Sequence, residues 1–227
     1  MPLLRTSFPV GALGCTCTIL ACPETKQALI VDPGDEAPRI VAELAAQGLT
    51  AVQIVHTHAH FDHVMGTALV ARATGAEASL HKADRFLYDH VPQQLAAFGM
   101  PAAPWPSAEA GPKLRELVGG ETLRFGRHEA RVIHTPGHTP GSLSILVEAP
   151  AERPLLMAGD TLFAGSIGRT DLWGGDFAEI VRSIRGPLFS LPEETLVIPG
   201  HGPETSIGLE REDNPHVGKY ARGAAPV

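Results

Sequence analysis

The sequence predicts an α/β fold built from apolar strands and amphipathic helices. Several short apolar runs end in glycine-containing turns, and after the first of them, ALIVDPGD, the segment EAPRIVAELAAQG repeats apolar residues at helical spacing. A chain of 227 residues with 44% hydrophobic residues, 24 Gly and 20 Pro has the composition of an ordinary globular α/β protein. No repeat, charge block or low-complexity linker divides the chain, so we expect one domain over residues 1–227, with 218–227 as a flexible tail.

Strands and helices alternate through the first half of the chain. Asp35 is placed to cap the first predicted helix, and Gly48 is placed to end it. A histidine-rich stretch comes at the end of the second predicted strand, AVQIVHTH, and before the next helix. The expected elements are, in chain order, a strand and turn at 28–35, a helix at 36–48, a strand at 51–58, a helix at 64–74, a strand at 75–81 and a short helix at 84–90.

A segment rich in proline and alanine follows, from Val91 to Pro112. Its composition predicts a long irregular excursion. Two interpretations are open. The segment is either an ordinary surface loop or a flap that contributes apolar contacts to a substrate, through Phe98, Met100 and Trp105.

The second half of the chain repeats one pattern, in which an apolar strand runs into a glycine-containing turn and then presents a polar side chain. The segments EARVIHTPGHTPGS, PLLMAGD and TLVIPGHG present His138, Asp160 and His201 in this way. Turns at strand ends place side chains along one edge of a sheet, and glycine lets the backbone approach closely. We therefore expect these three side chains and the histidine-rich stretch at one rim.

The histidine-rich stretch, HTHAHFDHV at residues 56–64, has the spacing of a metal site. In an extended segment alternate side chains share a face, so His58 and His60 point the same way and can bind one cation. Asp62 and His63 are adjacent at the junction of loop and helix, and they project from a different position. The stretch therefore supplies part of the ligand set for two cations.

Three strand-end residues complete the two shells. His138 joins the first cation, His201 joins the second, and the carboxylate of Asp160 bridges them. Every ligand atom is nitrogen or oxygen, a set that suits Zn, Fe, Mn or Ni. The absence of a thiolate removes the strongest argument for zinc alone.

The remaining histidines and the cysteines are interpreted as structural. His56 lies back within its strand, and it is assigned a core or supporting role, as is His134. Cys15, Cys17 and Cys22 lie in a strand-like stretch, and their odd number fits reduced thiols in a cytosolic chain better than disulfides. The histidines without a partner in the pattern are His81, His90, His128 and His216.

Charge and hydropathy disfavour two classes of partner. The chain has 18 Lys and Arg against 25 Asp and Glu, a formal charge of -7, which is unfavourable for a protein that grips phosphate backbones. No apolar run approaches the roughly 18 residues of a membrane span. We expect a cytoplasmic protein with no nucleic-acid or membrane partner.

The motifs THAHFDH, TPGHTPGS, AGDTLFAGSIGRTD and IPGHGPET closely resemble the successive motifs of the metallo-β-lactamase superfamily, over roughly residues 28–215. The resemblance implies an αββα sandwich of two mixed sheets flanked by helices. The positions that match the family's ligands are His58, His60 and His138 for one metal, Asp62, His63 and His201 for the other, and Asp160 between them.

Within this superfamily, GDTLFAGSIGRTDLWGGD and PGHGPETSIGLEREDNP resemble the short glyoxalase II-like hydrolases, which cleave thioesters of glutathione. The resemblance implies hydrolysis of S-lactoylglutathione, or of another hydroxyacylglutathione, by a hydroxide that bridges two divalent cations. We expect zinc first, with iron or manganese as alternatives. Asp62 is expected to ligate a metal and to orient the hydroxide. The helical C-terminal domain with which full-length glyoxalase II holds glutathione has no counterpart after His201, so the mode of glutathione binding stays open.

Other functions remain as alternatives. A persulfide dioxygenase of the same fold would use one Fe(II), with His58, His138 and Asp160 as its ligands. A lactonase and a non-catalytic metal-binding protein are further alternatives, whereas lactam hydrolysis is disfavoured because the commonest metallo-β-lactamases carry Cys at the position of Asp160. Arg169 and Asp171 are expected to form a buried ion pair or a turn lock, and the alternative is that Arg169 binds a substrate carboxylate.

Overall fold

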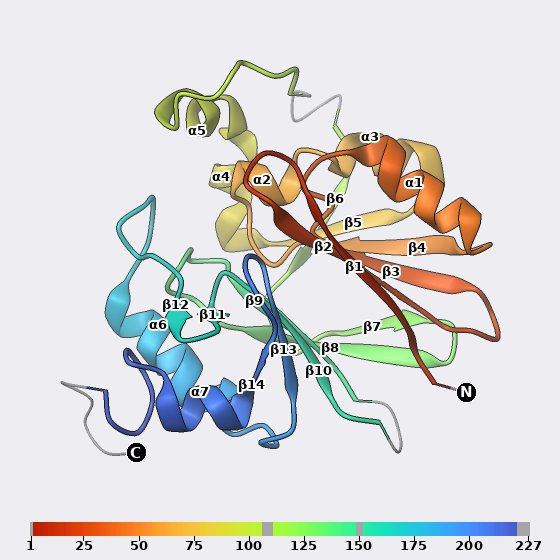
Figure 1. Ribbon diagram of the computed structural model, residues 1–227. Helices are drawn as coiled ribbons and strands as arrows, with labels where there is room; N and C mark the ends of the chain where they lie inside the picture. The colour runs from red at the N-terminus through yellow and green to blue at the C-terminus, as the bar shows by residue number, and fades with distance from the viewer. Residues whose placement is uncertain (1, 106–110, 149–151, 222–227) are drawn as a thin grey trace. The chain divides into compact units, whose positions relative to one another are not determined.

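The computed structural model describes residues 2–105, 111–148 and 152–221 (Figure 1). Within them the chain divides into two compact units. The first unit runs to Leu117 and adds Arg124–His128, and the second contains Val118–Leu123 and the chain from Glu129 onward. The first unit contains one six-stranded mixed sheet and the second unit contains most of another, so the α/β prediction is confirmed. The expectation of one domain stays a prediction.

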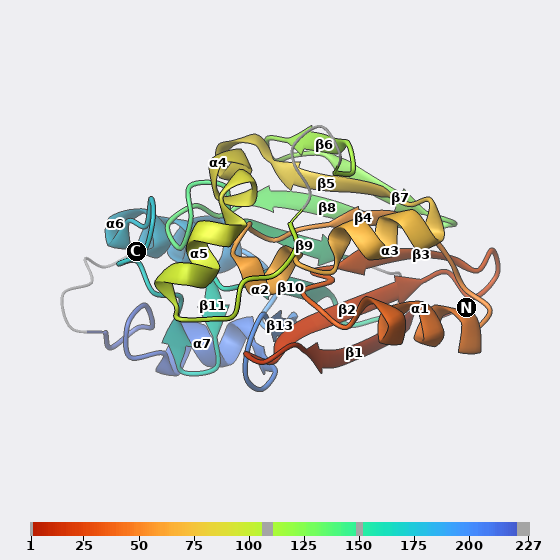
Figure 2. The ribbon, with the colours of Figure 1, turned by 90° about the horizontal axis from the view of Figure 1, so that it is seen from above.

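The sheet of the first unit is antiparallel at one end and parallel at the other. The turn after β1 reverses the chain, whereas helices connect the parallel strands, as parallel pairing requires. The helices α1 (Ala37–Ala46) and α3 (Thr67–Thr74) pack against each other, and Ile40, Leu44 and Val70 join the strand residues in one core (Figure 2). The strand order is β1 (Leu4–Val10), β2 (Cys15–Ala21), β3 (Gln27–Val31), β4 (Thr50–Val55), β5 (Glu77–His81) and β6 (Leu114–Leu117).

The prediction of one helix over 64–74 is wrong in one respect, because the structure has two helices around this segment, separated at Gly66. α2 (Phe61–Val64) ends ahead of Gly66, and α3 begins after it. The backbone N–H of Gly66 donates to the carbonyl of Pro33 at 2.9 Å, and a Cβ at this position would lie 2.4 Å from that oxygen. The chain turns here because it closes against the turn that follows β3.

The expected capping role of Asp35 is also wrong. The residue at the start of α1 is Glu36, which has a φ of 51° and makes no side-chain capping bond. The carboxylate of Asp35 accepts from the Glu36 N–H at 2.6 Å and not from a later turn of the helix. α1 ends at Ala46, two residues ahead of Gly48, as predicted.

The irregular excursion predicted from Val91 begins as a helix instead. α5 (Val91–Ala97) follows a 3₁₀ turn (Lys82–Asp84) and α4 (Arg85–Asp89), which is the short helix expected at 84–90. Pro92 lies in the first turn of α5, where its missing N–H costs nothing and its fixed φ favours the helix. The segment from 98 to 105 has no regular structure, and residues 106–110 lie outside the described part of the chain.

The sheet of the second unit carries helices on one face. Ile180 and Ile184 lie on and just after α6 (Phe177–Ser183), and they pack with Ile207 of α7 (Ile207–Asp213) against strand residues such as Leu156 and Val197. In Figure 1 both helices lie along this sheet. The strand order is β14 (Thr205–Ser206), β13 (Leu196–Pro199), β10 (Leu155–Gly159), β9 (Leu143–Val147), β8 (His128–His134) and β7 (Thr122–Phe125), and β11 (Leu162–Phe163) pairs with β12 (Ser166–Ile167).

The last residues of the chain are only partly described. The expected tail at 218–227 falls mainly outside the described residues, and within them the N–H of Lys219 donates to the carbonyl of Arg211 at 2.9 Å. Among the described residues, no helix has the length and apolar character needed to cross a membrane.

Gly137 provides a test of how tightly the turn after β8 packs. Its φ is 134°, and a Cβ there would lie 2.2 Å from the backbone nitrogen of Ile180 in α6. We expect Gly137→Ala to lower the free energy of unfolding by about 3 kcal/mol or more, through strain and overpacking, as measured by urea denaturation. Gly120→Ala is the control, because Gly120 has a φ of 93° but open space at its Cβ position. Equal losses in the two variants would contradict the packing argument.

Candidate metal centre

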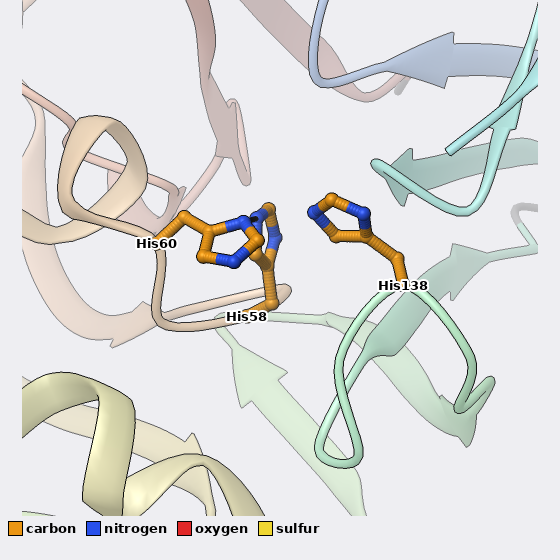
Figure 3. Close-up of side chains that lie close together, drawn as sticks. All are labelled: His58, His60 and His138. Atoms are coloured by element: carbon orange, nitrogen blue, oxygen red, sulfur yellow. Dashed lines mark hydrogen bonds between the residues drawn. The ribbon is translucent and has the colours of Figure 1, made fainter. Parts of the chain in front are cut away.

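The histidine-rich stretch covers the loop between β4 and α2 and the helix α2 itself, and its histidines are buried. Figure 3 shows the imidazoles of His58 and His60 on this loop and that of His138 on the turn after β8. Nε2 of His58 lies 3.1 Å from Nδ1 of His60, and the two rings are nearly perpendicular, at 88°. Two ring nitrogens that face each other at this distance can share one cation.

The carboxylate of Asp32 accepts hydrogen bonds from residues of the histidine-rich stretch. Its Oδ1 accepts from the Thr57 N–H at 2.7 Å, and its Oδ2 accepts from the Thr57 hydroxyl at 2.6 Å and faces Nδ1 of His63 at 2.9 Å. Asp32 is 1% exposed, so this carboxylate depends on those donors to offset its desolvation. Sequence reasoning treated Asp32 only as part of a turn and missed this role.

These contacts determine which ring nitrogen of His58 and of His63 carries the proton. An ionised carboxylate only accepts, so Nδ1 of His63 donates to Asp32 and Nε2 keeps its lone pair. The Thr57 hydroxyl gives its hydrogen to Asp32, so at 3.1 Å its oxygen accepts from Nδ1 of His58. Nε2 of His58 therefore also keeps its lone pair, which is the form that binds a metal.

Two further buried side chains hold the backbone of the loop, and the sequence analysis missed both. The carboxylate of Asp84 accepts from the Ala59 N–H at 3.1 Å. The amide of Gln94 in α5 accepts from the Phe61 N–H at 3.1 Å and donates to the carbonyls of Ala59 at 3.0 Å and Leu87 at 2.8 Å. No short motif links these residues to the loop, because they are 25 to 35 positions away from it.

In the second unit, the three predicted strand-end residues lie together. Oδ2 of Asp160 is 3.7 Å from Nε2 of His138 and 3.7 Å from Nε2 of His201. Nδ1 of His138 lies 2.8 Å from the carbonyl oxygen of Arg169, which can only accept, so this nitrogen carries the proton and Nε2 turns its lone pair toward Asp160. The carboxylate of Asp160 thus lies between two imidazoles.

The donor atoms of each unit fit divalent cations. Ligands on one tetrahedral ion with bonds of about 2.0–2.1 Å lie roughly 3.3 Å apart. The measured separations are 3.1 Å for His58 and His60, 3.7 Å for Asp160 with each of its histidines, and 3.8 Å between Nε2 of His63 and Oδ2 of Asp62. Lone-pair nitrogens held from behind by a carboxylate or carbonyl are typical of metal-binding histidines.

His56 lies near these ligands but is assigned a structural role, and the group formed by Cys15, Asp32 and His63 is assigned no cation. His56 is fully buried, burial lowers its pKa to about 4, and its Nε2 lies 3.1 Å from the hydroxyl of Thr67. Cys15, Asp32 and His63 offer ligand atoms within 4.8 Å of one another. However, Nδ1 of His63 already donates to Asp32, so this nitrogen has no lone pair for a cation, and burial raises the pKa of the Cys15 thiol to about 12. We assign no cation to that group.

Arg169 and Asp171 form the predicted ion pair, but it is exposed and not buried. Nε and Nη2 of the guanidinium each donate to a carboxylate oxygen of Asp171 at 2.7 Å, with side-chain exposures of 53% and 68%. The pairing lowers the pKa of Asp171 to about 2. The ion pair joins two residues of one turn, and a substrate carboxylate would have to compete with Asp171 for the guanidinium of Arg169.

Comparison with known proteins identifies the family to which nearly the whole chain is related. A family model described as the metallo-beta-lactamase superfamily matches residues 10–201. The chain is 33% identical over 215 residues to hydroxyacylglutathione hydrolase GloC of Haemophilus influenzae, over 92% of this chain and 95% of that protein. It is 36% identical to the probable metallo-hydrolase YqgX of Bacillus subtilis, over 94% and 97% of the two chains. This chain belongs to the metallo-β-lactamase superfamily.

Solved structures of this superfamily superpose closely. The B3 metallo-β-lactamase BLEG-1 has a TM-score of 0.83 and 35% identity, over 94% of this chain and 99% of that chain. TTHA1623 in a di-iron-bound form has a TM-score of 0.79 and 36% identity, over 92% and 98%. The predicted fold class, two mixed sheets flanked by helices, is confirmed, and the chain is a metal-dependent hydrolase of the metallo-β-lactamase superfamily.

Gln94 offers a test of the loop's support. Gln94→Leu removes one acceptor and two donors, and it leaves the Phe61 N–H and the Ala59 and Leu87 carbonyls without them in a buried region. We expect the free energy of unfolding to fall by about 2–4 kcal/mol in a denaturant titration. Gln93→Leu is the matched control, because Gln93 is the exposed neighbour on the same helix. A similar loss in both variants would refute the assigned role.

Asp32 offers a test of how the histidines are oriented. Asp32→Asn keeps the shape of the side chain but removes the charge that holds Nδ1 of His63 and, through Thr57, that of His58. We expect Zn²⁺ affinity, measured by competition with a chromogenic chelator, to fall about 10- to 100-fold. Asp89→Asn, which removes only an exposed ion pair with Arg85, should leave the affinity unchanged. Unchanged affinity in Asp32→Asn would show that the carboxylate does not orient the ligands.

Proposed function

We propose that this protein hydrolyses thioesters of glutathione with the help of two divalent cations. The observation that carries the proposal is the 33% identity to hydroxyacylglutathione hydrolase GloC over nearly the full length of both chains. The proposed ligands are His58, His60 and His138 for one cation, Asp62, His63 and His201 for the other, and Asp160 shared by both. The lone-pair nitrogens of His58, His63 and His138 support this assignment.

Zinc is the first choice of metal, and iron and manganese also suit nitrogen and oxygen donors. The likeness to TTHA1623, described in a di-iron-bound form, supports iron as the main alternative. When bound, two such cations would lower the pKa of water toward 7 and polarise the thioester carbonyl.

Asp62 is the proposed catalytic residue of the chain. Its side chain is 14% exposed, and its Oδ2 lies 3.8 Å from Nε2 of His63, so one carboxylate oxygen can serve as a ligand while the other accepts a hydrogen bond from the attacking water. That hydrogen bond would aim a water lone pair at the carbonyl carbon. A thiolate is a good leaving group, so the reaction requires no strong general acid, and none is assigned.

β-lactam hydrolysis is the second candidate, because BLEG-1, named a B3 metallo-β-lactamase, is 35% identical over nearly the whole of both chains. BLEG-1 and GloC match this chain with nearly the same identity and coverage, so the comparisons do not decide between a β-lactam and a thioester substrate. The thioester is preferred on the motif resemblance between Gly159 and Asp176. A persulfide dioxygenase with one iron and a lactonase are further outcomes of the same assays.

One purified preparation tests the function. We expect elemental analysis to find two metals per chain, with turnover of S-lactoylglutathione or another glutathione thioester. Turnover of a cephalosporin alone would support the lactamase candidate, and oxygen uptake with glutathione persulfide and one iron per chain would support the dioxygenase. Absence of turnover on ester, thioester and lactone panels with metals present would refute the proposal and support a binding protein.

Asp160→Ala tests the shared ligand. Removing the carboxylate that lies 3.7 Å from two imidazoles should reduce metal content below one equivalent and lower kcat at least about 100-fold. Asp171→Ala removes a nearby exposed carboxylate that is not a proposed ligand, and metal content should stay at two equivalents. Normal metal content and activity in Asp160→Ala would exclude the bridging role.

A further inference from the structure

The first unit contains a small cavity of about 230 Å³, and Asp62 is one of the residues that line it. Its floor is formed by residues of the α2 region, Phe61 and Met65 among them. One wall is the turn between β1 and β2, with Ala12 and Leu13, and the other is the end of α5 and the segment that follows it. Along that second wall lie Leu95, Met100 and Ala102.

We propose that this cavity receives the acyl chain of the thioester, and that the substrates are thioesters with an aliphatic acyl group longer than acetyl. The inference rests on the proposed thioester function. Asp62 is both a proposed participant in the reaction and one of the residues that line the cavity, so a thioester whose carbonyl carbon lies beside Asp62 can extend its acyl substituent into the cavity.

The chemistry of the lining favours an apolar chain. Among the described residues that line it, the side chains with polar oxygen or nitrogen atoms are the carboxylates of Asp35 and Asp62, and Oδ1 of Asp35 already accepts from the Glu36 N–H at 2.6 Å. In the part of the chain that the structure describes, the lining has no hydroxyl or amide side chain to bind a 2-hydroxyl such as that of a lactoyl group. Each methylene transferred to apolar surroundings gains about 0.8 kcal/mol, which is roughly a 4-fold gain in affinity.

The size of the cavity limits the chain. A water molecule takes about 30 Å³ in the liquid, so 230 Å³ is the space of about seven or eight waters and accommodates a chain of roughly four to six carbons. Such a chain would fill the cavity without displacing the walls.

Both walls are held by hydrogen bonds, so the cavity is formed before the substrate binds. The N–H of Gly14 donates to the carbonyl of Gly11 at 3.2 Å, and the N–H of Gly11 donates to the carboxylate of Glu36 at 3.0 Å. On the other side, the N–H of Met100 donates to the carbonyl of Leu95 at 2.9 Å. A preformed apolar cavity spares the ligand the cost of ordering its walls.

The test combines binding and turnover in the intact protein loaded with metal. Calorimetry compares S-methylglutathione with S-hexylglutathione, two thioethers that are not hydrolysed, and kinetics compare S-acetyl-, S-hexanoyl- and S-lactoylglutathione. We expect S-hexylglutathione to bind at least 10-fold more tightly than S-methylglutathione. We also expect kcat/KM for the hexanoyl thioester to exceed that for the acetyl and lactoyl thioesters by at least 10-fold.

Two variants narrow the cavity from opposite walls. Ala102→Phe and Ala12→Phe replace exposed alanines of the lining, and each should reduce the hexyl-to-methyl affinity ratio and the hexanoyl-to-acetyl ratio of kcat/KM at least 5-fold. Ala97→Phe is the matched control, because Ala97 is an exposed alanine at the end of α5 that does not line the cavity, and both ratios should stay at the wild-type value.

The outcomes separate the two proposals. Equal affinity for the two thioethers in the wild-type protein, or ratios that neither lining variant changes, would overturn the acyl cavity even if thioesters are hydrolysed. A hexyl preference that the lining variants abolish, without turnover of any thioester, would support the cavity and refute the thioester function.

Discussion

The carboxylate of Asp32 is the constraint on which the histidine-rich loop depends. It is buried, its backbone has a φ of 50°, and its own N–H donates to the carbonyl of Val55 at the end of β4. A non-glycine residue adopts this conformation at an energetic cost, which persists only where the surroundings compensate for it. Here the compensation is the set of donors on Thr57 and His63, and the same hydrogen bonds place the protons on His58 and His63.

In the second unit, the acceptor that orients His138 is weaker than the one that orients His63 in the first unit. His138 donates from Nδ1 to a backbone carbonyl, that of Arg169, whereas His63 donates to a carboxylate. A charged acceptor makes the opposite ring nitrogen a stronger base than a neutral one does. The two proposed cations would therefore differ in the basicity of their histidine ligands, although the ligand types are nearly the same. Asp160, with its oxygen equally distant from His138 and His201, suits either cation.

The sequence predicts well those features that depend on local spacing. The strands that precede the site residues, their glycine turns and the alternation of His58 and His60 are properties of adjacent residues, and these strands are present in the structure, although the strand expected over 51–58 ends at Val55. The break at Gly66 was not predictable, because it arises from contact with Pro33, more than 30 positions earlier. Asp84 and Gln94 were missed for the same reason, since they bond backbone groups of a distant segment. A polar residue directly after the buried run Leu29–Val31 was the available signal for Asp32.

Overall sequence similarity does not decide the substrate of this chain. GloC and BLEG-1 carry names for different reactions, yet each is about one third identical to this chain over nearly its full length. A ligand set that activates water and polarises a carbonyl serves an amide, an ester or a thioester equally well. Discrimination must therefore come from interactions with the rest of the substrate, which act on kcat/KM through the walls around the reacting carbonyl. Under the proposed acyl cavity, those walls are the turn between β1 and β2 and the segment after α5, whose sequences carry no motif, and their apolar side chains would select the substrate.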